Sequence, residues 1–388
     1  MSHESRQLSY LIIFRLTRSL AAGIIILVLP YYVLVYLHYS VFTLGMLYTA
    51  ATLATAVFAL LFGFLTDLWG HKNTLLLSGI LLPLGAILAF ISGRLPVLFI
   101  ASMLGGFSAT GSRAAGSVGG AAQPIQSAVI ADLTSLHNRT FWFSLFTFLS
   151  GLVGAAGMLS ARLFSARDAF LAAAVASGIG LLFLLPMKLS TGEGKLKRLR
   201  SGKVIGKFSL TAALNGLSQG LVMPFLIPFF VIVYGVPKSR MSVYGFASEL
   251  VAAVAILISP LLERRFGFVK GVAVTRGVGA LLLLLLPLTR IFALALVVYM
   301  LTPALRIAAI PAQQTALTAM VHENEMGRAL AMNQVARLTT SAGAVGFTGY
   351  MFDLSDIGLP FYAYAAITAV SLALYFRFFG ANPELRPE

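Results

Sequence analysis

The chain has 388 residues, of which 59% are hydrophobic and only 11% are charged, and its mean hydropathy is +0.90. Soluble domains carry roughly a quarter charged residues, so this composition excludes a soluble globular protein and indicates a polytopic membrane protein. The net charge of +15 does not indicate nucleic-acid binding, because most Lys and Arg residues lie in short loops between hydrophobic runs. The absence of cysteine excludes disulfides and Cys-based metal sites.

Hydrophobic runs of about twenty residues, the length that crosses a bilayer, recur along the whole chain. Residues 1–7 show no cleavable signal peptide, so we expect the first run to be retained as a helix. The runs predict an all-α polytopic membrane protein with twelve transmembrane helices, at residues 8–37, 42–66, 73–92, 95–131, 140–163, 168–187, 208–235, 242–262, 269–288, 291–320, 329–352 and 359–379.

The longest polar interruption, residues 188–207, lies at the middle of the chain and holds seven basic residues and one acidic residue. It predicts an N-terminal six-helix bundle at 1–187, a basic cytoplasmic linker at 188–207 and a C-terminal six-helix bundle at 208–388. Loops rich in Lys and Arg face the cytoplasm. We therefore expect both termini on the cytoplasmic side of the inner (cytoplasmic) cell membrane.

The two halves of the sequence resemble each other, which predicts a pseudo-symmetric 6+6 arrangement. Residues 121–128 (AAQPIQSA) recur as residues 308–316 (AAIPAQQTA), and the turn at 63–72 recurs in weaker form at 259–267. The register of the second repeat is ambiguous by one residue. Internal duplication is common in transporters, whose binding sites lie between the repeats.

The turn that follows the second predicted helix has the sequence GFLTDLWGHK, from Gly63 to Lys72. It resembles the loop between helices two and three of the major facilitator superfamily, whose pattern is roughly Gly-x-x-x-Asp-Arg-x-Gly-Arg-Lys/Arg. Gly63, Asp67, Gly70 and Lys72 match that pattern, whereas Leu68 and His71 depart from it, which weakens any detailed charge-relay analogy.

The resemblance implies two six-helix bundles that rock about a central site and open alternately to each side of the membrane. It also implies that this turn acts as a cytoplasmic gate, with Glu263, Arg264 and Gly267 in the second copy. A plain turn at the membrane surface is the structural alternative.

Six arginines lie inside predicted helices, where a charge costs at least ~2.5–3.5 kcal/mol and so usually faces a cavity or a partner. Arg15 and Arg18 share one face of the first helix, and snorkelling to the interface is the alternative for them. The others are Arg113, Arg276, Arg306 and Arg337. We expect Arg15, Arg18, Arg113, Arg306 and Arg337 to line the central cavity.

The fourth predicted helix, 95–131, is nearly twice the length that a bilayer needs, and it contains six glycines between residues 105 and 120. Gly and Pro break or bend helices, so we expect a broken or bulged helix that presents Arg113 to the cavity. Tight helix packing on small residues is the alternative. The spacing from Arg113 to Pro124 also resembles, approximately, the fourth helix of drug–proton antiporters in the superfamily.

Glu249 is the only carboxylate well inside a predicted helix. Burial raises the pKa of a carboxyl group, which suits proton coupling, although Glu249 could instead be a charge partner of Arg276 or Arg306. Amide side chains inside predicted helices complete the candidate cavity, and interhelical hydrogen bonding is the alternative for each of them. These are Gln126, Asn215, Gln219, Gln313 and Asn333.

No nucleophile elbow, Walker loop or metal-ligand spacing is present, so we expect no enzymatic activity, cofactor or metal. The sequence predicts a monomeric secondary active transporter that moves a small solute by alternating access, with lipid and the solute as its partners. The excess of arginine favours an organic anion, with proton coupling. A proton-driven multidrug efflux antiporter and a non-transporting membrane receptor or scaffold are the alternatives.

Overall fold

The computed structural model describes residues 3–108, 120–134, 136–189, 201–319, 321 and 326–380. Helices dominate this part of the chain because a backbone in lipid must satisfy its own hydrogen bonds. The long helices are α1 (His3–Tyr31), α2 (Val41–Ile91), α3 (Leu95–Gly105), α4 (Gln123–Leu133), α5 (Leu136–Ser160), α6 (Asp168–Leu184), α7 (Gly202–Val222), α8 (Leu226–Tyr234), α9 (Lys238–Leu285), α10 (Phe292–Ala319), α11 (Met326–Asp353) and α12 (Gly358–Phe379). Short π- or 3₁₀-helical pieces are η1 (Tyr32–Tyr36), η3 (Gly120–Ala122), η4 (Ala161–Leu163) and η5 (Met223–Phe225).

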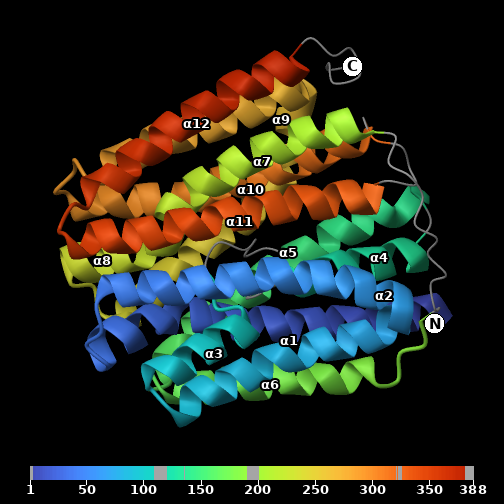
Figure 1. Ribbon diagram of the computed structural model, residues 1–388, viewed down its shortest axis with the longest axis horizontal. Helices are drawn as coiled ribbons and strands as arrows, with labels where there is room; N and C mark the ends of the chain where they lie inside the picture. Colours follow the sequence, from blue (N-terminus) through green and yellow to red (C-terminus); the bar gives the residue numbers. More distant parts are fainter. Residues whose placement is uncertain are drawn as a thin grey trace.

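Helices α2 and α9 each run through two predicted spans and turn back at a single glycine (Figure 1). Gly70 has φ 78° and ψ 165°, and Gly267 has φ 71° and ψ 170°, a backbone region that is essentially restricted to glycine. The two glycines therefore hold the same place in the two repeats. They fix the register that the sequence left open, and Arg264, not Glu263, occupies the position of Asp67.

The fourth predicted span is broken, as the glycine-rich segment led us to expect. Helix α3 ends at Gly105, and Gly106 follows in the left-handed conformation with φ 62°. The N–H of Phe107 donates to the carbonyl of Ser102 at 3.0 Å, which closes the end of the helix. Helix α4 then begins at Gln123. Arg113 lies outside the described residues.

Several described helical stretches are apolar and long enough to cross a membrane. Six reach this length: Arg6–Tyr36, Val41–Thr66, Leu68–Ile91, Trp142–Leu163, Gly202–Tyr234 and Gly358–Phe379. Shorter apolar helices are Leu95–Gly105, Asp168–Leu184 and Phe292–Ile307. Together with α9 and α11, they follow the twelve predicted spans in chain order.

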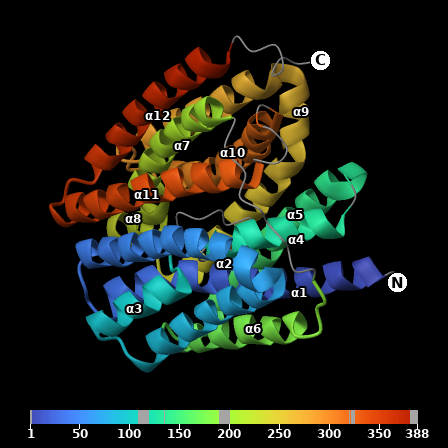
Figure 2. The ribbon, with the colours of Figure 1, turned by 45° about the vertical axis from the view of Figure 1, so that its right-hand side comes forward.

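The first and second halves of the chain form two neighbouring groups of helices (Figures 1 and 2). Helices α1–α6 lie in the lower group, and α7–α12 lie in the upper one. The groups meet where α2 packs on α11 and where α5 packs on α9. We call the end that contains Tyr31 and Asp353 the Tyr31 end, and the opposite end, where α2 turns back, the Gly70 end.

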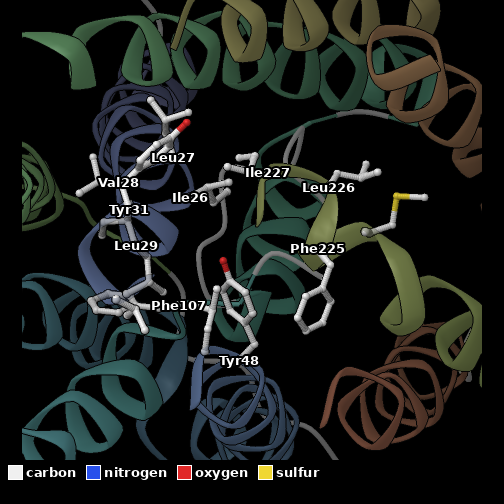
Figure 3. Packing of buried hydrophobic residues seen from close by; sticks show 14 of the residues in the cluster. Ile26, Leu27, Val28, Leu29, Tyr31, Tyr48, Phe107, Phe225, Leu226 and Ile227 are labelled. Carbon is white, nitrogen blue, oxygen red and sulfur yellow. The ribbon is translucent and has the colours of Figure 1, made fainter. Parts of the chain in front are cut away.

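An apolar core crosses from one half to the other toward the Tyr31 end. Figure 3 shows Tyr48 of α2 facing Phe225 of η5, and their ring centroids are 6.3 Å apart at 86°. Phe225 also contacts Phe352 of α11, at 5.3 Å between centroids. The edge-to-face contact between Tyr48 and Phe225 joins the two halves and adds to the burial of apolar area, so this core holds the two halves together.

Candidate functional site

Hydrogen bonds between the halves lie toward the Tyr31 end. The hydroxyl of Tyr31 donates to the carbonyl of Val236 at 2.7 Å. The Asp353 carboxylate accepts from the first two backbone N–H groups of α2, at 3.1 and 3.4 Å, which are donors that a helix leaves unsatisfied. The Lys238 ammonium donates to the carbonyl of Phe164. These contacts close the molecule at this end.

Small residues let α2 and α11 approach closely in the same region. A Cβ atom placed on Gly45 would lie 2.9 Å from Cα of Gly349, and a Cβ on Gly349 would lie 3.0 Å from Cα of Gly45. Thr49 donates to the carbonyl of Ala342 at 3.0 Å. Such close packing on small residues is typical of helix pairs in membranes.

At the Gly70 end, the predicted gate is tied to its own half. Lys72 donates to the carbonyl of Leu185 at 2.7 Å, which joins the second part of α2 to the end of α6. Gly63 has open space where a side chain would be. The side chains of Asp67, Glu263 and Arg264 lie outside the described part, so the gating role of this loop stays a prediction.

Arg15 is buried between α1, α4 and α5, with 4% of its surface exposed. Its Nε donates to Oγ of Ser150 at 2.8 Å, and a terminal nitrogen donates to Oε1 of Gln126 at 3.4 Å. The guanidinium also lies over the ring of Phe146, at 5.7 Å. Two of the predicted cavity residues, Arg15 and Gln126, are thus brought together by contacts inside the N-terminal half.

Arg18 is buried between α1 and α2, with 3% of its surface exposed. It donates to the carbonyls of Ser78 at 3.2 Å and Gly79 at 3.4 Å, and it lies 5.4 Å from the ring of Phe14. Arg15 and Arg18 therefore both bind protein groups and tie helices together. Their role as substrate ligands stays a prediction, which this geometry does not favour.

The C-terminal half contains a small polar cavity of about 30 Å³, roughly the share of one water molecule in the liquid. It lies among α7, α9, α10 and α12, and half-buried Arg276 and Arg306 line it from two of these helices. The other lining residues are Asn215, Gln219, Thr275, Gly279, Thr302, Tyr364 and Thr368.

The charge around this cavity is positive. Arg276 interacts electrostatically with Arg337, Tyr364 and Tyr375, none of which carries a carboxylate. Tyr364 also lies within electrostatic reach of Arg306. Three arginines of the C-terminal half therefore lie in one positive region, and two of them, Arg306 and Arg337, are among the residues predicted to line the central cavity. Their role at such a cavity stays a prediction.

Amide side chains of the C-terminal half make defined hydrogen bonds. Gln219 Nε2 donates to Oδ1 of Asn215 at 3.0 Å, one turn earlier on α7. Asn333 Nδ2 donates to the carbonyl of Phe208 at 3.0 Å and ties α11 to α7. The side chain of Gln313 lies outside the described part.

The sequence places Arg276 inside a predicted helix, but Arg276 is not among the predicted cavity residues. Thr275, Thr302 and Tyr364, which also line the small cavity, are not among them either. The internal repeat could have pointed to Thr275, because Thr275 follows Gly267 by the same interval as Ser78 follows Gly70, so the two hydroxyl residues occupy equivalent positions. That signal becomes readable only after the structure has fixed the register.

Glu249 on α9 is 3% exposed and is the one buried carboxylate among the described side chains. Asp168, Asp353 and Asp356 are exposed. The described residues contain no group of His, Cys, Asp and Glu side chains that could hold a metal ion.

Comparisons with known proteins agree on one fold. A search of curated proteins gives no match. The structure resembles a D-xylose–proton symporter (14% identity, 100% of each chain covered, TM-score 0.77) and a bacterial homologue of the human lysosomal transporter Spinster in an inward-facing, occupied conformation (15% identity, 100% and 99% covered, TM-score 0.77). It also resembles the human organic anion transporter MFSD10 (13% identity, 97% and 100% covered, TM-score 0.72).

A family model described as the Major Facilitator Superfamily matches residues 11–337, which is most of the chain. The resemblance of the Gly63–Lys72 turn is thereby confirmed, together with the twelve-helix fold. A protein of this family is a multi-pass membrane transporter rather than an enzyme, and its substrate is a small molecule. The chain belongs to the Major Facilitator Superfamily of secondary transporters.

Proposed function

We propose that this transporter moves a small organic anion. The observation that carries the proposal is the gathering of Arg276, Arg306 and Arg337 in the C-terminal half, where Glu249 is the one buried carboxylate of the described residues. Guanidinium groups bind carboxylate and phosphate oxygens with two parallel hydrogen bonds. A positive potential inside a low-dielectric wall concentrates anions and weakens the binding of cations.

The contacts at the Tyr31 end support an inward-facing state. By the positive-inside rule, the basic loops of the Gly70 end and both termini lie on the cytoplasmic side of the inner membrane. The Tyr31 end, closed by Tyr31, Lys238 and Asp353, then faces outward. In this proposal the protein is a monomer whose two six-helix bundles rock about the contacts between α2 and α11. The bundles are residues 1–187 and 208–388, and the linker 188–207 joins them.

Arg337 is the residue that we propose to meet the anionic group of the substrate. It is half-buried on α11, the helix that packs against α2 of the other half, and it does not line the small cavity. The Arg337 side chain therefore lies outside the small cavity, but its charge adds to the same positive region.

The test uses proteoliposomes that contain the purified protein and a panel of radiolabelled mono- and dicarboxylates, with lipophilic cations as the comparison. Wild-type protein should accumulate one or more anions and no cation. Arg337→Gln should lower the rate roughly ten-fold or more, the effect of losing one charge-assisted hydrogen bond. Arg290→Gln, at an exposed position on the loop before α10, is the matched control and should transport like wild type.

Uptake of lipophilic cations in place of anions would overturn the anion assignment and favour a multidrug efflux antiporter. Equal transport by wild type and Arg337→Gln would remove Arg337 as the contact. Protein that binds solutes without moving any of them across the bilayer would favour a receptor.

Glu249 is our proposed proton carrier, because it is buried on α9. Its neighbours on that helix, Gly245 and Ala253, lie against Met158 and Gly151 of α5 in the other half. Glu249→Gln keeps the size and removes the ionisable group. We expect this variant to exchange labelled for unlabelled substrate across the membrane but to lose accumulation driven by a pH gradient. Undiminished gradient-driven accumulation would exclude Glu249 from proton coupling.

A further inference from the structure

The small cavity of the C-terminal half has features that transport of an organic anion does not require. Its residues come from α7, α9, α10 and α12, which all belong to one half, so the cavity is not formed between the two halves. Its volume of about 30 Å³ has room for one ion or water molecule and is smaller than a whole carboxylate-bearing metabolite.

The residues that line this cavity carry positive charge and include no carboxylate. Arg276 and Arg306 each contribute a guanidinium group. Asn215 accepts at Oδ1 from Gln219, so its Nδ2 keeps two N–H donors for other partners. Thr275 and Thr302 donate their hydroxyl hydrogens to carbonyls of their own helices, so these side chains add no further donors.

Arg276 carries the argument for a charged occupant. Its electrostatic neighbours among the described residues are Arg337, Tyr364 and Tyr375, which do not neutralise it. A guanidinium group such as that of Arg276 is unfavourable in a membrane interior without a counter-ion. The side chain of Arg276 also lies directly beside the cavity, where a counter-ion would contact it.

We propose that this cavity binds one small monatomic anion, of which chloride is the abundant natural form. The ion neutralises Arg276, accepts hydrogen bonds from Arg306 and Asn215, and stabilises the packing of four helices. This assigns Asn215, Gln219 and Arg306 to a site apart from the substrate. The proposal stands on the cavity and does not depend on which solute the protein transports.

The test measures thermal unfolding of the purified full-length protein in gluconate buffer, with chloride replacing gluconate at constant ionic strength. An ion that binds only the folded state raises the unfolding temperature saturably. We expect chloride and bromide to do so and sulfate, which is too large for the cavity, to have no effect. Binding of ³⁶Cl⁻ should saturate at one ion per protein and be displaced by bromide.

Arg276→Gln should weaken the apparent chloride affinity roughly ten- to a hundred-fold, the loss of one charge-assisted hydrogen bond. Arg290→Gln removes an exposed arginine and should respond to chloride like wild type. Asn215→Asp covers the case in which Arg276→Gln fails to fold. Its added carboxylate replaces the ion, so this variant should be as stable in gluconate as wild type is in saturating chloride, and should not respond to chloride.

A wild-type protein whose unfolding temperature is the same in chloride and gluconate would overturn the proposal. So would an unchanged chloride response in Arg276→Gln or Asn215→Asp. These readouts require no transport, so a failure of the organic-anion proposal leaves them unaffected.

Discussion

The crossing of α2 and α11 at Gly45 and Gly349 provides a direct test of which end of the molecule is closed. A Cβ atom on Gly45 would lie 2.9 Å from Cα of Gly349, 3.3 Å from the carbonyl oxygen of Val345 and 3.4 Å from the ring of Phe225. All three belong to the opposite half. Gly45→Ala should therefore push the halves apart at the Tyr31 end and favour the state in which this end is open.

The size of the effect follows from the geometry. Carbon atoms in contact are normally ~3.5–4.0 Å apart, so the helices must separate by at least ~0.6 Å or accept an overpacked contact. Overpacking typically costs about 1–3 kcal/mol. That cost lowers the ratio of closed to open Tyr31 ends roughly five- to 150-fold. The helix propensity gained by replacing Gly45 acts on α2 in both states and cancels in this ratio.

Spin labels can measure the shift, because the chain has no cysteine of its own. Tyr36 and Ile291 are 58% and 65% exposed at the Tyr31 end of the two halves and can be replaced by labelled cysteines. Pulsed electron–electron double resonance should find a longer distance more populated in Gly45→Ala than in the parent protein. Gly343→Ala, on α11 with no atom within 4 Å of its Cβ, is the matched control. Identical distance distributions for Gly45→Ala and its parent, or an equal shift for Gly343→Ala, would refute the reasoning.

Three further predictions concern substitutions at single positions. Gly70→Ala and Gly267→Ala should each destabilise the protein by about 1–3 kcal/mol, because both glycines have positive φ in a backbone region restricted to glycine. Thermal unfolding measures this loss. The control is Gly63→Ala, whose added methyl group meets no neighbour and should not lower stability. Asp353→Ala should remove the acceptor for the first two backbone N–H groups of α2, at a cost of about 0.5–2 kcal/mol. Cysteines introduced inside the Tyr31 end should then react faster with a thiol reagent, and an unchanged reaction rate would contradict this prediction. Arg15→Met should lower stability by about 1–3 kcal/mol by leaving buried polar partners unsatisfied, and stability equal to wild type in thermal unfolding would show that these bonds contribute nothing.

The intramembrane arginines illustrate how the tertiary structure separates residues that look alike in sequence. Arg15 and Arg18 lie on the same helix face at a similar depth, and the sequence does not indicate which residues they contact. The fold supplies Ser150 and Gln126 for the first and carbonyls of α2 for the second, so both are satisfied within their own half. Arg276, in contrast, lines a cavity, which makes it the better candidate for an external ligand.

The sequence by itself determined the class of the protein, the number and order of its helices and the break in the fourth span. Those features follow from local quantities, namely the length of apolar runs, the position of Gly and Pro, and the distribution of Lys and Arg, which lipid constrains strongly. The Gly63–Lys72 turn identified the family for the same reason, since its spacing is contained in ten residues.

Only the tertiary structure decided the register of the repeat, the residues around the polar cavity and the end at which the halves are closed. Gly70 and Gly267 matched once their backbone angles were known. The bond from Asp353 to the start of α2 joins residues more than 300 positions apart, and the cavity needs four helices to meet. Such contacts depend on how helices pack around each other, which the periodicity of one segment does not encode.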